Sequence, residues 1–178
     1  MVKNVKLNKI AVYYHGLGGE ASLHIKNKMA EFGYYLITET VDFYGEWFKD
    51  RGRSFMDKQI KKFKKIDLVI GLSFGGHIAY LLSKETGANL LLINPAVNRA
   101  RSTTGIHTYV SPKSNKSSNI EIYLGEYDTT VPMQYTLEFF RNTGEEYNAY
   151  KISNMQHNMY YHEFDFIVEH SNLVNSHD

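Results

Sequence analysis

The chain has 178 residues, 43% hydrophobic and 22% charged, with a formal net charge of +1, and this length and composition are typical of one globular domain, here residues 1–178. The near-neutral charge gives no electrostatic reason to expect nucleic acid or anionic lipid as a partner. The sequence has no cysteine, which excludes a thiol nucleophile, a zinc–thiolate centre and a disulfide framework.

Strand-like and helix-like segments alternate through the first half of the chain. Runs of β-branched and aromatic residues predict strands at 9–16 and 34–43, separated by a helix at 20–33 that ends at a glycine. Residues 44–53 contain two glycines and predict a loop. The basic run KQIKKFKK at 58–65 spaces its apolar residues as an amphipathic helix does, so we interpret its lysines as a solvated face.

The second half continues the alternation. The apolar run at 66–72 predicts a strand covered on both faces, and a helix follows it as far as Gly87. Further strands are predicted at 89–96, 119–128 and 146–153, and further helices at 133–144 and 164–174. Strands that alternate with helices in this way predict an α/β fold, with a mostly parallel six-stranded sheet and helices on both faces.

Residues that could take part in catalysis follow four of the predicted strands. HGLGG (15–19) follows the first strand, and Ser73 follows the third within Gly-x-Ser-x-Gly-Gly. Asp128 follows the fifth strand in GEYDTTVP, and His157 follows the sixth in SNMQHNM. Ligands of open parallel sheets bind outside the carboxyl ends of the strands. We therefore expect these residues to meet at one edge of the sheet.

With its motifs in this order the chain resembles the α/β-hydrolases, in which a Gly-x-Ser-x-Gly elbow joins a strand to a helix and the acid and histidine follow later. It is most similar to the small, nearly lid-less bacterial esterases of the YqiA type, which begin almost at once with a strand followed by His-Gly. The resemblance extends from about residue 10 to about residue 170. It implies a minimal α/β-hydrolase fold with little or no lid, and an activity that needs no cofactor.

The chemistry of such a site assigns a role to each of three side chains. A serine hydroxyl is a poor nucleophile unless a base removes its proton during attack, and a third group must hold that base in the right tautomer. We assign Ser73 as nucleophile, His157 as general base and then general acid, and Asp128 as the carboxylate that orients the histidine.

The resemblance also implies where the substrate binds. An oxyanion hole would be formed by the backbone N–H groups of Leu17, in the loop after the first strand, and of Phe74, directly after the serine. One such donor is typically worth about 3–4 kcal/mol of the barrier. We expect the substrate site to be lined by Gly16, His15, Tyr44 and Tyr109.

The same residues allow other interpretations. The glycines around Ser73 could form a phosphate-binding turn, but neither Gly-x-Gly-x-x-Gly nor Gly-Lys-Ser/Thr is present. Asp128 could be a turn residue, with Glu126 as the rival acid, and His162 and His170 compete with His157. Although the chain has eight histidines, no His-x-x-x-His or His-Glu-x-x-His motif supports a metal site. We therefore predict no metal.

The predicted function is that of a serine hydrolase acting on carboxylic esters, with thioesters as a second substrate class. An amidase, or an enzyme acting on a carbon–carbon bond, would use the same triad, and a non-catalytic binding or scaffold protein of the same fold is the alternative of another class. Residues 98–119 are polar and too few for a deep lid, which favours acyl groups of about two to six carbons.

Partners and location are predicted from what the sequence lacks. We expect a small-molecule ester as partner, with no nucleic acid and no membrane, and the sequence predicts no oligomeric state. Residues 1–10 lack the apolar region of a signal peptide, and no stretch approaches the roughly 18 apolar residues of a membrane span. We therefore expect a cytoplasmic protein.

Overall fold

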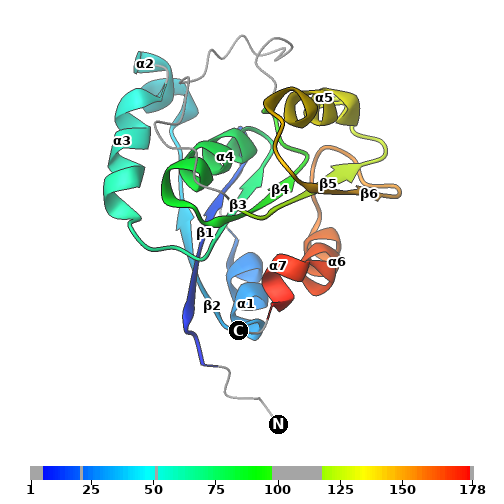
Figure 1. The fold of residues 1–178 in the computed structure, drawn as a ribbon, viewed down its shortest axis with the longest axis horizontal. Coiled ribbons are helices and arrows are strands. Elements are labelled where there is room, and N and C mark those ends of the chain that lie inside the picture. The colour runs from blue at the N-terminus through cyan, green and yellow to red at the C-terminus, as the bar shows by residue number, and fades with distance from the viewer. Residues whose placement is uncertain (1–5, 21, 51, 98–117, 177–178) are drawn as a thin grey trace.

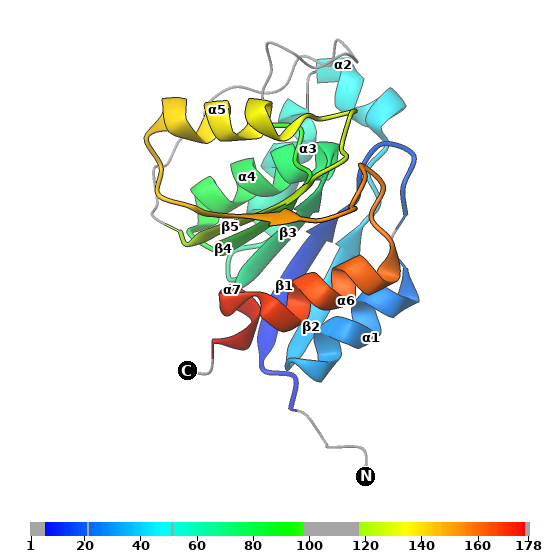
Figure 2. The ribbon, with the colours of Figure 1, turned by 90° about the vertical axis from the view of Figure 1, so that its right-hand side faces the viewer.

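Six parallel strands form a single sheet in the computed structural model of the protein, which describes residues 6–20, 22–50, 52–97 and 118–176. The strands lie in the order β2-β1-β3-β4-β5-β6, and each neighbouring pair is parallel. Their bounds are β1 Lys9–Tyr14, β2 Tyr34–Glu39, β3 Leu68–Leu72, β4 Asn89–Ile93, β5 Ile120–Gly125 and β6 Asn148–Ile152. The predicted α/β fold class is confirmed, with helices on both faces of the sheet (Figures 1 and 2).

The helices divide between the two faces. One face is covered by α1 (Leu23–Glu31), α6 (Tyr161–His170) and the short α7 (Asn172–Asn175), and the other by α3 (Arg53–Lys62), α4 (Phe74–Thr86) and α5 (Met133–Thr143) (Figure 2). Among the described residues, no helix is both long and apolar enough to cross a bilayer.

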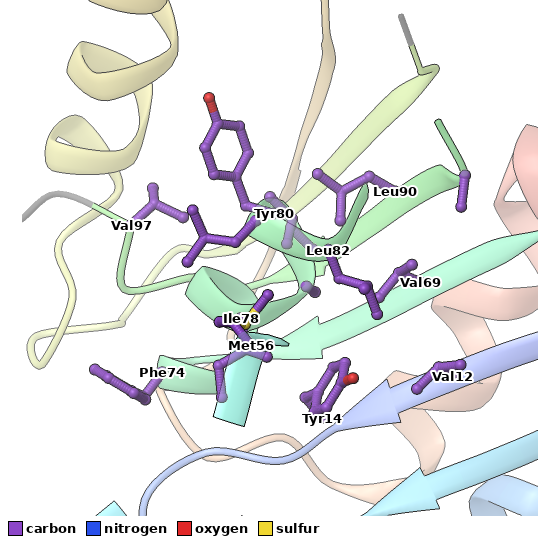
Figure 3. Close-up of a cluster of buried hydrophobic side chains, with 14 of the residues drawn as sticks. Val12, Tyr14, Met56, Val69, Phe74, Ile78, Tyr80, Leu82, Leu90 and Val97 are labelled. Atoms are coloured by element: carbon purple, nitrogen blue, oxygen red, sulfur yellow. The ribbon is translucent and has the colours of Figure 1, made fainter. Parts of the chain in front are cut away.

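Each face of the sheet packs its own hydrophobic core, because side chains alternate along the strands. In β1, Val12 and Tyr14 point toward α3 and α4, whereas Ala11 and Tyr13 belong to the core under α1 and α6. Figure 3 shows the first of these cores, in which Val12 and Tyr14 of β1 belong to the same cluster as Val69 of β3 and Ile78 of α4. The central strands are therefore apolar on both faces, which explains their continuous hydrophobic runs in the sequence.

The prediction of a loop at residues 44–53 is wrong. A π-helical turn, η1 (Phe43–Trp47), continues into the short helix α2 (Phe48–Asp50). The cause is aromatic packing: Trp47 is fully buried and its ring meets that of Phe74 edge-on, with ring centres 5.3 Å apart. The chain then turns at Gly52, which has φ 79° and where a Cβ would overlap the Trp47 ring.

The order of the strands determines where a ligand can bind. The chain runs from β1 through α1 to β2 at one edge, and then crosses back over the other face to β3 on the opposite side of β1. The carboxyl ends of β1 and β3 thus form a topological switch point, the usual ligand site of such sheets. Ser73 follows one of these two strands, and the Gly16–Leu17 loop follows the other.

Candidate active site

Ser73 occupies a sharp elbow between β3 and α4. Its backbone has φ 54° and ψ −121°, a conformation that costs a non-glycine residue free energy and is held by its surroundings. The Ser73 N–H donates to the Ile93 carbonyl at 3.0 Å, and its carbonyl accepts from Ala96 N at 2.8 Å. A Cβ at Gly75 would overlap the backbone oxygen of Tyr14, so only glycine lets α4 begin this close to β1.

His157 and Asp128 extend from Ser73 in one hydrogen-bonded chain. The Oγ of Ser73 lies 2.8 Å from Nε2 of His157, and Nδ1 of His157 lies 2.8 Å from Oδ2 of Asp128. A carboxylate can only accept, so Nδ1 carries a proton. In a neutral ring, Nε2 is then free to accept from the serine hydroxyl. This is the tautomer in which a histidine can act as a base toward a hydroxyl.

The carboxylate of Asp128 is itself fixed. Its side chain is 1% exposed, and its other oxygen, Oδ1, accepts from the backbone N–H groups of Thr130 at 2.9 Å and Val131 at 2.8 Å. The sequence GEYDTTVP thus folds a turn around the carboxylate. Both oxygens have partners, which limits the carboxylate to one orientation toward His157.

Asn94, which the sequence analysis did not single out, fastens the histidine loop. It follows β4, has φ 43° and is 1% exposed. Its Nδ2 donates to the carbonyls of Gln156 at 2.8 Å and His157 at 3.3 Å, while its Oδ1 accepts from Gly125 N at 2.7 Å. The signal in the sequence is a polar residue directly after a buried strand, followed by proline in INPA.

The predicted oxyanion donors lie beside Ser73. Phe74 is the first residue of α4, so its N–H has no acceptor within the helix, and Leu17 lies in the loop that borders the same cavity. A Cβ at Gly16 would come within 3.0 Å of the Ser73 Cβ. His15 is buried and holds this loop: its Nε2 accepts from Val41 N at 3.3 Å, and its Nδ1 donates to the Gly16 carbonyl at 2.7 Å.

A cavity of about 490 Å³ opens beside Ser73 and His157. The loop residues His15, Gly16 and Leu17 contribute to its lining. The remaining walls come from the two faces of the sheet. On the side of α1 and α6 they include Tyr13, Ser22, Ile25, Met159 and Tyr161, and on the side of α5 they include Thr130, Val131, Tyr135 and Thr136. This volume falls within the usual range of small-molecule sites.

Two residues expected at the substrate site are not part of this lining. Tyr44 lies in η1 with 75% of its surface exposed and does not border the cavity. Tyr109 lies outside the described residues, as does nearly all of the segment 98–119 that was expected to replace a lid.

The alternative acid and the two alternative histidines make their contacts away from Ser73. Glu126 pairs with Lys151 at 2.8 Å, and this lysine holds the pKa of the Glu126 carboxyl below its usual range. His162 is exposed and stacks on Tyr160, while Nδ1 of His170 bonds to the Phe166 carbonyl within α6. Within the described residues, no group of three or more His, Cys, Asp or Glu side chains could hold a metal ion.

No known family profile matches the chain, and no curated protein matches it. Solved structures do. The esterase domain of a Rhodothermus marinus protein aligns over 93% of this chain and 85% of its own length, with a TM-score of 0.68 and 11% identity. SOBER1 of Arabidopsis thaliana aligns over 89% and 95%, with a TM-score of 0.64 and 14% identity.

MGS-MChE2, an α/β-hydrolase enzyme from a sediment metagenome of the Mar Chica lagoon in Morocco, aligns over 90% of this chain and 89% of its own length. Its TM-score is 0.63 and its identity is 19%. At this level of identity the likeness is one of fold. The chain has a minimal α/β-hydrolase fold.

Proposed function

We propose that the protein is a serine hydrolase that cleaves carboxylic esters through an acyl-enzyme on Ser73. The observation that carries the proposal is the continuous chain from Ser73 Oγ through the His157 ring to Asp128, with 2.8 Å at each step. Esterases among the solved structures of similar fold agree with it. The same proposal includes three further points: membership of the YqiA type, a cytoplasmic location and a preference for small-molecule esters.

Acylation would proceed from this arrangement. As Ser73 Oγ attacks the ester carbonyl carbon, Nε2 of His157 takes the hydroxyl proton, and the positive ring that results is stabilised by Asp128. The negative charge that develops on the carbonyl oxygen would be met by the N–H groups of Leu17 and Phe74. When the tetrahedral intermediate collapses, His157 gives its proton to the leaving alcohol, and the acyl group stays on Ser73.

Deacylation reverses the roles with water as the nucleophile. Nε2 of His157 removes a proton from water as its oxygen attacks the acyl carbon, and the same proton returns to Ser73 Oγ as the acid leaves. His157 is 19% exposed in its side chain, while Asp128 is 1% exposed. The base is therefore reachable by water, while the carboxylate that orients it is shielded.

Thioesters and amides would pass through the same intermediates, so the triad alone does not select among them. Esters are favoured as the main class because an alcohol leaves more readily than an amine does. A non-catalytic role for the fold is the opposing hypothesis, and a covalent probe separates the two.

The test is labelling with a fluorophosphonate, followed by mapping of the modified peptide. We expect a single adduct on Ser73, no adduct in Ser73→Ala, and a fall in esterase activity of several orders of magnitude in that variant with unchanged folding. Ser54→Ala, which removes an exposed hydroxyl on α3, is the matched control. Retention of more than a tenth of the activity in Ser73→Ala, or absence of the adduct, would overturn the proposal.

A further inference from the structure

One buried hydroxyl in the cavity wall has no partner within the described chain. Tyr13, on β1, is 2% exposed and lines the cavity beside Ser73. The other buried tyrosines all donate to an acceptor: Tyr14 to Gln59, Tyr34 to the Leu173 carbonyl, Tyr80 to Glu145 and Tyr123 to Glu121. No hydrogen bond joins the Tyr13 hydroxyl to any described part of the protein.

The Tyr13 hydroxyl keeps some accessible surface. Its oxygen is not among the completely enclosed polar atoms that lack a hydrogen bond. What little of Tyr13 is exposed therefore includes this oxygen, and Tyr13 borders the cavity. Burial raises the pKa of this phenol, so it stays protonated and can donate. A substrate that fills the cavity displaces the water around this donor, and a donor then left without a partner costs free energy.

The strand register places Tyr13 relative to the nucleophile Ser73. The register of β1 on β3 pairs Tyr13 with Ile70, three residues before Ser73, a rise of about 10 Å along the strand. The Tyr13 ring lies on the side of α1, where Ser22 also lines the cavity and caps α1 by accepting from Ile25 N at 3.3 Å. A substrate held at Ser73 and extending toward α1 along this wall would pass the Tyr13 side chain.

We infer that the Tyr13 hydroxyl binds an oxygen-bearing group of the substrate. The preferred substrates are then short esters that carry a hydroxyl, ether or carbonyl oxygen near the scissile bond, and plain alkyl esters are poorer. The inference rests on the proposed esterase activity and adds a substrate class to it. An alkyl chain in the same place would leave the phenol unpaired, and this penalty discriminates against substrates that lack the polar group.

Two isosteric pairs of esters test which substrate is preferred. Methyl 3-hydroxybutyrate is compared with methyl 3-methylbutyrate, so that the oxygen is on the acyl side. For the alcohol side, 2-hydroxyethyl butyrate is compared with propyl butyrate. We expect the purified enzyme to hydrolyse the hydroxylated member of at least one pair with a kcat/KM about tenfold higher, the value of one well-made hydrogen bond in a buried site.

Tyr13→Phe removes only the hydroxyl. We expect it to abolish the tenfold preference, in part by raising kcat/KM for the alkyl esters, because their binding no longer leaves a phenol unpaired. The melting temperature should stay unchanged, because the hydroxyl has no partner among the described residues. Tyr123→Phe is the matched control: Tyr123 is equally buried on the same face of the sheet, but its hydroxyl donates to Glu121 at 3.2 Å. That variant should lower the melting temperature and keep the substrate preference.

The outcomes separate this inference from the proposed function. If the wild-type enzyme hydrolyses both members of each pair equally, or if its preference persists in Tyr13→Phe, the inference is wrong and the esterase stands. If the wild-type enzyme hydrolyses none of the four esters but is labelled on Ser73 by the fluorophosphonate, only the inference is wrong. If it is not labelled either, both are wrong.

Discussion

Replacing Asn94 tests whether the histidine loop is held from β4. In Asn94→Ala, the Gly125 N–H loses its acceptor in a site where Asn94 is 1% exposed, and an orphaned buried donor costs about 1–3 kcal/mol. Alanine at φ 43° adds about 1–2 kcal/mol of backbone strain, which asparagine tolerates better. We expect the free energy of unfolding to fall by roughly 3 kcal/mol, measured by urea denaturation.

The same substitution releases the carbonyls of Gln156 and His157, so the histidine is no longer held at its distance from Ser73. A displacement of about 1 Å at a catalytic group can cost a hundredfold in rate. We expect kcat for a p-nitrophenyl ester to fall about ten- to hundredfold at a temperature where the variant is fully folded. KM should hardly change, because Asn94 does not line the cavity.

Asn94→Gly separates the backbone effect from that of the side chain. Glycine accepts φ 43° without strain, so this variant should regain about 1 kcal/mol of stability over Asn94→Ala while its kcat stays equally low. A kcat that is unchanged in both variants, despite lower stability, would show that Asn94 supports the fold without positioning His157.

Three further predictions concern the proposed catalytic groups and the substrate. Asp128→Asn keeps an acceptor for Thr130 and Val131 but no longer holds the productive tautomer of His157, so kcat should fall about ten-thousandfold while the melting temperature changes little. A large fall in melting temperature with kcat intact would indicate a structural turn residue instead. Because the proton of Ser73 is transferred through the His157 ring, His157→Ala should be inactive, whereas His170→Ala should keep its kcat/KM for the same p-nitrophenyl ester. Across p-nitrophenyl acetate, butyrate, octanoate and palmitate, kcat/KM should peak at or before butyrate, within the predicted range of about two to six carbons; a value still rising at octanoate contradicts this.

Much of the fold could be predicted from the sequence because its signals are local. Each strand is a short apolar or β-branched run, and glycines mark the turns, so all six strands and their alternation with helices were expected. Boundaries were less accurate where a cap decides them. The helix predicted from residue 20 begins at Leu23, because Ser22 accepts from Ile25 N and caps it there.

The catalytic candidates were predictable for a related reason. Parallel strands bring their carboxyl ends to one edge, so residues distant in sequence meet if each directly follows a strand. Ser73, Asp128 and His157 all satisfy that condition, and the structure brings their side chains into one hydrogen-bonded chain. Tyr44 was expected at the substrate site from its type alone, and nothing in its sequence context fixed the side on which η1 would present it.

Contacts between side chains of different elements could not be predicted from the sequence in this way. Phe43 and Trp47 both meet the ring of Phe74 edge-on, at 5.0 Å and 5.3 Å between ring centres, and His15 meets Phe43 in the same way at 5.7 Å. These rings join η1 to the loop after β1 and to the start of α4, the two segments that carry the predicted oxyanion donors. Phe74 therefore contributes its side chain to the rigidity of the site, beside the N–H that is predicted to bind the oxyanion. Such a contact among three separate segments follows from the tertiary structure and not from any periodicity.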